Sequence, residues 1–406
     1  MEGIASVLRR HRRRVSKKDQ QDGFIKLFIS KRIIHGSAAA ILGIFVPIFL
    51  YETSGNQFYI VGGYYALLSL LYVILLVPSM WIANQIGFSR TLVLGGVFGT
   101  AIYIIMYFLS PANVWQMILP LTFAIVGFRL FHWVPFHVDF TLFTKDGERG
   151  RQVSLSFATI AFMGVIGPIL AGFIIANAGY EALFATATAL TIAATISYWF
   201  VPETLTRFEW TWWQTWKKLF SKDMRHVVVG EFANGMEVIV NLIVWPIFLY
   251  ELLQGDVFEI GAVSTIVVGA TILIQIFLGR YLDKQKDTKE RTLRVGSTLY
   301  AVGWVLKIFV ISTLQVFLVG LYHNIVKIFT KTPFSAILYD MSAEQGKYVD
   351  EFTVLREMAG HLGRAVCLIL VSVLVYFLPI SIGWMFVIAA FASIALNLVY
   401  RVQLTD

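Results

Sequence analysis

Long apolar stretches separated by short polar segments dominate the sequence from residue 33 onward. A helix needs about 20 predominantly apolar residues to cross a bilayer, and twelve stretches approach that length. The pattern therefore predicts an all-α membrane protein with twelve transmembrane helices. They are expected near 33–51, 59–82, 91–109, 115–138, 153–177, 181–201, 227–250, 258–279, 293–312, 315–338, 353–378 and 381–400.

The two halves of the chain carry matching landmarks in the same order. The run Pro47-Ile48-Phe49-Leu50-Tyr51-Glu52 recurs 199 residues later as Pro246-Ile247-Phe248-Leu249-Tyr250-Glu251. Three shorter matches follow it at similar offsets: Phe58 and Ile60 with Phe258 and Ile260, Pro135-Phe136 with Pro333-Phe334, and Gly164 and Gly167 with Gly360 and Gly363. Such a period indicates one unit written twice. With six spans in each copy, the repeat is parallel, about an axis along the membrane normal.

Four parts of the chain follow from this repeat. We predict a basic cytoplasmic arm over 1–32, a first six-helix bundle over 33–201, an amphipathic linker over 202–226 and a second six-helix bundle over 227–402. The linker places Phe208, Trp212, Trp216 and Leu219 on one helical face, which is typical of a helix lying at the membrane surface. A binding platform for a partner protein is the alternative.

Composition agrees with a membrane protein and excludes some chemistry. Hydrophobic residues make up 57% of the chain and charged residues 14%, whereas soluble domains have roughly 25% charged residues. The mean hydropathy is +0.71. The single cysteine, Cys367, allows neither an internal disulfide nor a cysteine metal cluster.

The lysines and arginines behind the net charge of +8 fall in some of the loops between the predicted spans and not in the others. Lysine and arginine concentrate in the arm and in 139–152, 202–226 and 280–294, while the alternate loops carry none. The positive-inside rule then predicts a multi-pass protein of the cell membrane with both termini in the cytoplasm. The arm is expected to contact anionic lipid, and this placement gives no support to nucleic-acid binding.

Short motifs lie at fixed places on these spans. Gly279 to Lys284 follows the pattern G-x-x-x-D-K, with Asp283 as its carboxylate, whereas the first-half copy has Asn84 in that place and keeps Arg90. Arg129 begins an R-x-x-H-W run that includes His132. Gly167-Pro168 with Gly172, and Pro202-Glu203-Thr204, complete the set.

On these residues the chain resembles a major facilitator superfamily transporter over its whole length after residue 32. The resemblance implies two pseudo-symmetric six-helix bundles, with spans one, four, seven and ten lining a central cavity. It also implies a small soluble solute, moved with a proton or in exchange, without a cofactor. We expect a monomer. In that family an aspartate stands where this chain has Asn84, so the cytoplasmic charge latch of the first half is in question.

Charged residues inside the spans are candidates for the solute site. A charge at the bilayer centre costs about 2.5–3.5 kcal/mol, so such side chains face the bundle interior. Arg129 and Lys327 are repeat mates and are expected to face each other. Alternatively, Glu237 pairs with Lys327 or Arg129 and only holds the halves together. The predicted substrate-binding residues are Arg129, His132, Asn234, Glu237, Asn241, His323, Lys327 and Lys331.

A second polar stripe lies on the eleventh span. Glu357, His361 and Arg364 recur at helical spacing and suggest either a proton relay or an interhelical network. The residues predicted for coupling or gating are Glu357, His361, Arg364, Asp283, Asn84 and Arg90.

Two facing cations favour a solute with an anionic group. We therefore predict a secondary transporter that moves a small anionic or polar solute by alternating access, with proton coupling as one option. A membrane scaffold or sensor derived from a transporter is the alternative, favoured by Asn84. No enzyme is expected, because soluble-enzyme motifs are missing and the duplication argues against an intramembrane enzyme built on His323, His132 or His361. His132, His137 and Asp139 lack the further ligand that a metal site needs.

Overall fold

The computed structural model describes residues 17–144, 149–204, 208–282, 289–344, 349–378 and 380–400. These residues form helices and connecting turns, with no strand among them. The first half contains α2 (Lys17–Leu27), η1 (Phe28–Ile34), α3 (His35–Leu42), α4 (Phe45–Thr53), α5 (Phe58–Ile86), α6 (Phe88–Phe108), α7 (Val114–Phe143) and α8 (Arg149–Tyr198).

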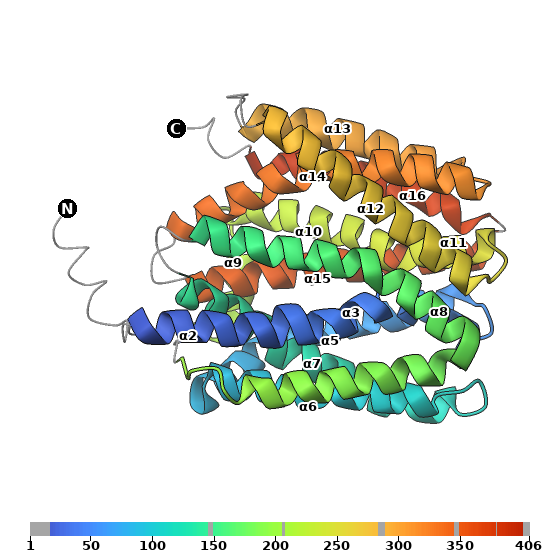
Figure 1. Ribbon diagram of the computed structural model, residues 1–406. Helices are drawn as coiled ribbons and strands as arrows, with labels where there is room; N and C mark the ends of the chain where they lie inside the picture. Colours follow the sequence, from blue (N-terminus) through green and yellow to red (C-terminus); the bar gives the residue numbers. More distant parts are fainter. Residues whose placement is uncertain are drawn as a thin grey trace.

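The second half follows the short linker helix α9 (Trp212–Leu219). It contains α10 (Arg225–Ile239), η2 (Val240–Val244), α11 (Trp245–Leu252), α12 (Val257–Leu282), α13 (Lys289–Ile308), α14 (Thr313–Glu344), α15 (Val349–Phe377), η4 (Ile382–Met385), α16 (Phe386–Ala395) and η5 (Leu396–Tyr400). The long helices run side by side, and the described chain starts and finishes at the same end of the bundle (Figure 1). We call this the terminal end. The opposite end, where α4 and α11 stop, is the distal end.

Many of these helices are suited to a membrane. Eight of the described helices are long and apolar enough to span a bilayer, or up to nine if the bent pair Gln21–Leu42 and Phe45–Thr53 is one span. This confirms an all-α membrane protein, whereas the exact number of twelve spans stays a prediction. Two observations explain the lower count. Helix α8 covers two predicted spans and breaks at Gly179, where φ is 76°. Helices α13 and α14, which carry buried or half-buried lysines, are not among the eight.

The helical part of the chain begins earlier than the predicted first span. Residues 17–32, assigned above to the basic arm, form α2 and most of η1. Phe24 and Leu27 are buried there, in a cluster with Phe136 and Phe143 of α7. The apolar face of this polar segment therefore packs on the bundle. Residues 1–16 of the arm lie outside the described residues.

The linker packs on both halves. Thr211 caps α9 by accepting a hydrogen bond from the Gln214 backbone, while Gln214 accepts one from the Thr211 N–H in return. Helix α9 contacts α5 of the first half and α15 of the second. Leu219, on the predicted apolar face, is buried, whereas Trp213 is exposed. The apolar face thus packs against protein.

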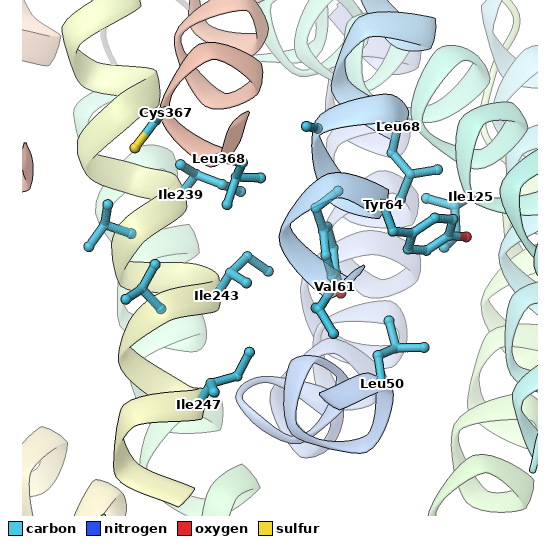
Figure 2. Close-up of a cluster of buried hydrophobic side chains, with 14 of the residues drawn as sticks. Leu50, Val61, Tyr64, Leu68, Ile125, Ile239, Ile243, Ile247, Cys367 and Leu368 are labelled. Carbon is cyan, nitrogen blue, oxygen red and sulfur yellow. The ribbon is translucent and has the colours of Figure 1, made fainter. Parts of the chain in front are cut away.

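The halves meet closely at two places. Near the distal end α8 crosses α12, where a Cβ added to Gly261 would lie 2.4 Å from the Pro168 carbonyl oxygen and 3.4 Å from the Cα of Gly172. Only glycine fits such a contact. Elsewhere an apolar core lies between α10, α5 and α15, and Figure 2 shows Ile239, Ile243 and Ile247 along one helix, with Val61 and Leu50 on neighbouring helices.

Candidate functional site

A small polar cavity of about 150 Å³ lies between α10, α14 and α15, in the part of the bundle nearer the terminal end. One water needs about 10–15 Å³ of such space, so the cavity has room for several waters. Five predicted site residues line it: Asn234, Lys331, Glu357, His361 and Arg364. Its other walls are Glu231, Gly235, Phe334, Ser335, Leu338, Arg356 and Gly360.

Glu231 and Arg356 form an ion pair in the cavity wall that the sequence analysis did not assign to the site. Glu231 Oε1 accepts hydrogen bonds from Arg356 Nε and Nη2, both at 2.7 Å. Asn234 Nδ2 donates to the other carboxylate oxygen at 2.9 Å. The sequence could have indicated Glu231 and Arg356, because both residues are charged and fall within predicted spans.

Lys331 links this pair to Glu237. Its Nζ donates to Asn234 Oδ1 at 2.5 Å and forms an ion pair with Glu237, whose side chain is fully buried. Tyr300 also donates to Glu237, at 2.6 Å. The ion-pair partner of Glu237 is therefore Lys331, one turn along α14 from Lys327 and within the same half. This pair does not join the two halves, contrary to the alternative considered above.

The stripe on α15 forms the boundary with the first half. Arg364 Nη1 lies 2.9 Å from His361 Nε2, and this nitrogen is 4.0 Å from Glu357 Oε2. The ring of His361 packs 4.1 Å, centroid to centroid, from that of Tyr72 on α5. Helices α5 and α15 are in extensive contact. The predicted network thus spans the interface between the halves.

Arg129 on α7 also belongs to this boundary. It interacts electrostatically with Arg364 and with the hydroxyls of Tyr64, Tyr65 and Tyr72. Within the described residues no carboxylate forms an ion pair with Arg129. The Nε of Arg364 is buried without a hydrogen-bond partner. Two guanidinium groups from different halves therefore interact electrostatically at this boundary, and the predicted pairing of Arg129 with Lys327 stays a prediction.

Other predicted residues lie outside the cavity. His323 is buried with its ring centroid 4.5 Å from those of Tyr300 and Trp304. Lys327 interacts electrostatically with Glu237 and Lys331. His132 stacks on His35 at 5.0 Å in the first half, and Asn241 lies half-buried in η2.

A buried lysine extends the polar network toward the distal end. The Nζ of Lys307 lies 4.0 Å from the ring centroid of Trp245 and 4.2 Å from that of Trp304. Lys307 also interacts electrostatically with Lys327 and Glu237. Lys307 was not among the predicted site residues.

Two of the residues predicted for coupling or gating, Asn84 and Arg90, lie near the terminal end. Asn84 hydrogen-bonds the backbone of Phe208 in the linker. Arg90 Nε is 4.0 Å from Glu203 Oε2, and partial burial raises the pKa of that carboxyl while Arg90 opposes the shift. Asp283 lies outside the described residues. No group of three His, Cys, Asp or Glu in the described part of the chain could hold a metal, and Asp139 is instead hydrogen-bonded by Thr204.

Comparison with known proteins identifies the family. The sequence profile of the major facilitator superfamily matches residues 27–229, half of the chain. The crystal structure of a mutant of the nucleoside transporter NupG has a similar fold, with a TM-score of 0.64 and 13% identity, over 92% of this chain and 98% of that one. The uncharacterized protein YqgE of Bacillus subtilis (strain 168) is 21% identical over 86% of this chain and 82% of its own length.

These findings confirm the predicted family and a multi-pass membrane protein with this fold. They support a secondary transporter of a small solute. The chain belongs to the major facilitator superfamily.

Proposed function

We propose that this protein moves a small anionic solute across the membrane by alternating access of the site between its two halves. The electrostatic interaction of Arg129 with Arg364 across the boundary of the halves carries the proposal. Both cations lie at the boundary of the halves, and Arg129 has no carboxylate partner among the described residues. Guanidinium groups bind carboxylate and phosphate through paired, charge-assisted hydrogen bonds.

The charge balance of the surrounding network points the same way. A continuous set of interactions joins six basic side chains to three carboxylates: Arg129, Lys307, Lys327, Lys331, Arg356 and Arg364 with Glu231, Glu237 and Glu357. Two of the carboxylates are already paired with Arg356 and Lys331. Excess buried positive charge is costly unless it is neutralised, either by a lysine that gives up its proton or by a bound anion. A bound anion would neutralise part of it.

The same geometry links solute binding to movement. Arg129 belongs to α7 in the first half and Arg364 to α15 in the second. Without an anion the two charges repel each other, and an anion between them attracts both. A ligand shifts a conformational equilibrium by its difference in affinity for the two states. An anion held by both arginines therefore favours the state in which the halves approach each other around it.

The proposal also includes proton coupling and the orientation of the protein in the membrane. Glu357 and His361 lie beside Arg364, where a change of protonation alters the charge that the solute meets. We place the terminal end in the cytoplasm, on the positive-inside rule. The alternative of a scaffold or sensor is weaker, because Asn84, the feature that favoured it, has a role in holding the linker.

A thermal-shift screen tests the solute class. The purified protein would be heated with inorganic phosphate, sulfate, succinate, glucose 6-phosphate or uridine. Uridine is the neutral member of the panel, chosen because the solved neighbour is a nucleoside transporter. A ligand at 100 times its Kd stabilises by about 2.7 kcal/mol. Stabilisation by anions is expected, and stabilisation by uridine alone would contradict the anionic class.

Flux in liposomes then tests transport. Uptake of the stabilising anion should be lost in Arg129→Gln and Arg364→Gln and retained in Arg294→Gln, which changes an exposed arginine on α13. Normal uptake by both arginine variants, Arg129→Gln and Arg364→Gln, would remove the anion proposal. Binding without any flux would favour the sensor.

A further inference from the structure

The two copies of the repeated sequence Pro-Ile-Phe-Leu-Tyr-Glu meet at the distal end. Tyr51 in the first copy donates a hydrogen bond to Glu251 Oε1 in the second at 2.5 Å. Conversely, the hydroxyl of Tyr250 in the second copy interacts with Glu52 in the first. The two tyrosine rings meet edge to face, with centroids 6.1 Å apart. Each copy therefore supplies the partner for the other.

This exchange joins the two halves at their distal tips. Helix α4 carries the first copy and contacts α11, which carries the second. Directly before each tyrosine-glutamate pair the copies supply buried apolar side chains, including Leu50 and Ile247. Figure 2 shows these two residues on neighbouring helices. The polar cavity lies farther toward the terminal end, so this apolar layer closes the distal side.

We propose that the reciprocal contacts Tyr51–Glu251 and Tyr250–Glu52 form the distal gate of the transport cycle. A hydroxyl that donates to a carboxylate makes a charge-assisted hydrogen bond, one of the stronger kinds in proteins. Both contacts run between the halves, so separation of the distal tips breaks both. Their pseudo-symmetry follows from the sequence repeat, because each copy presents a tyrosine and a glutamate in the same order.

The gate is not fully symmetric. Glu52 also interacts with Tyr180, on α8 of its own half. Glu52 therefore keeps a partner when the halves separate. Glu251 is exposed, and its hydrogen bond from Tyr51 crosses to the other half. We therefore expect the Tyr51–Glu251 contact to limit opening. The proposal needs the halves to move, but it does not depend on the charge of the solute.

Cysteine labelling tests the gate without any solute. In a Cys367→Ser background, Leu50→Cys places a thiol in the apolar layer, and a membrane-impermeant maleimide measures its exposure in purified full-length protein. Tyr51→Phe and Tyr250→Phe remove the two hydroxyls singly and together. Thr313→Val is the matched control, because Thr313 donates to Glu259 at 2.6 Å between α14 and α12, within one half at the same end.

The tyrosine variants should increase the labelling rate of Leu50→Cys by about tenfold or more, which corresponds to about 1.4 kcal/mol. The double variant should exceed either single one, and Thr313→Val should leave the rate unchanged. A thiol in the cavity, at Ser335→Cys, should become less reactive in the same variants, because opening one end closes the other. A fall at Ser335→Cys with a rise at Leu50→Cys supports the gate.

Two results would overturn the proposal. One is a labelling rate in the double variant equal to that of Thr313→Val. The other is a parallel rise at Leu50→Cys and Ser335→Cys, which indicates general loosening. Should a tyrosine variant aggregate, Glu251→Ala removes the acceptor from an exposed position, and the same outcomes apply. Since no solute is present, failure here is distinct from failure of the anion proposal.

Discussion

Asn84 holds the backbone of Phe208 through both ends of its side-chain amide. Its Nδ2 donates to the Phe208 carbonyl oxygen at 3.0 Å, and its Oδ1 accepts from the Phe208 N–H at 3.1 Å. An ionised aspartate has acceptors only and could make just one of these bonds. The next residue, Glu209, donates its N–H to Glu351 Oε1 on α15 at 2.9 Å. Consecutive linker residues are thus attached to opposite halves.

Asn84→Asp should therefore weaken the attachment of the linker. The lost donor leaves the Phe208 carbonyl without its partner, at a cost of about 1–3 kcal/mol. Hydrogen exchange at residues 208–212 should accelerate, and the melting temperature should fall. Asn56→Asp, at an exposed turn with a φ of 59° that aspartate also tolerates, is the control. Unchanged exchange in Asn84→Asp would show that the amide pair is not what holds the linker.

Lys331→Met should destabilise the protein strongly. Breaking a buried ion pair leaves an uncompensated charge and costs about 3–5 kcal/mol, and Glu237 is fully buried. The double variant Lys331→Met/Glu237→Gln should recover part of that loss in thermal unfolding. Lys26→Met is the control, because the Lys26–Asp22 pair is exposed and such pairs contribute at most about 1 kcal/mol. Equal effects of the two lysine variants would contradict the expectation.

Arg129→Gln should raise stability while it abolishes the response to an anion. The substitution removes a positive charge that interacts unfavourably with Arg364 and has no carboxylate partner in the described residues. Functional sites often hold such unfavourable arrangements, and their removal exchanges activity for stability. The melting temperature without solute should rise, and the shift caused by the stabilising anion should vanish. A lower melting temperature without solute would mean that Arg129 has a structural role.

Two glycine-to-alanine variants should change stability in opposite directions, because one glycine lies at a close helix contact and the other does not. A Cβ at Gly235 on α10 would lie 1.9 Å from the Gly360 carbonyl oxygen of α15, so Gly235→Ala must push the two helices apart. A Cβ at Gly63 on α5 meets nothing within 4 Å. Gly63→Ala should therefore stabilise by about 0.5–1 kcal/mol, through helix propensity alone. Thermal unfolding should show opposite signs for the two variants.

The fold could be predicted because its signals are local. Stretches of about 20 apolar residues and a repeated six-residue run are readable without knowledge of which helices touch. Gly179 is an example, because the predicted gap between two spans coincides with a helix break at this single glycine, where φ is 76°. The packing of α2 could not be read in the same way, because its apolar residues are outnumbered by polar ones.

The site was only partly predictable, because helical spacing tells which residues share a face and not what faces them. His323, Lys327 and Lys331 were placed on one side of a helix, yet their partners differ: Lys331 meets Glu237, and His323 packs against aromatic rings. The repeat suggested Lys327 opposite Arg129. That pairing stays a prediction, whereas the interaction of Arg129 with Arg364 depends on contacts between distant segments, among them the packing of α5 on α15.

The crossing of α8 and α12 has a mechanical consequence. Gly172 lies seven residues before the break at Gly179 and 23 residues after the start of α8 at Arg149. At 1.5 Å per residue these are arms of about 10 Å and about 35 Å. With no side chain between the backbones to slide or compress, the crossing can act as a fulcrum set off-centre. A tilt that separates the distal tips by about 3 Å would move the terminal end of α8 by about 10 Å. A small opening at the distal end would therefore accompany a large closure at the terminal end.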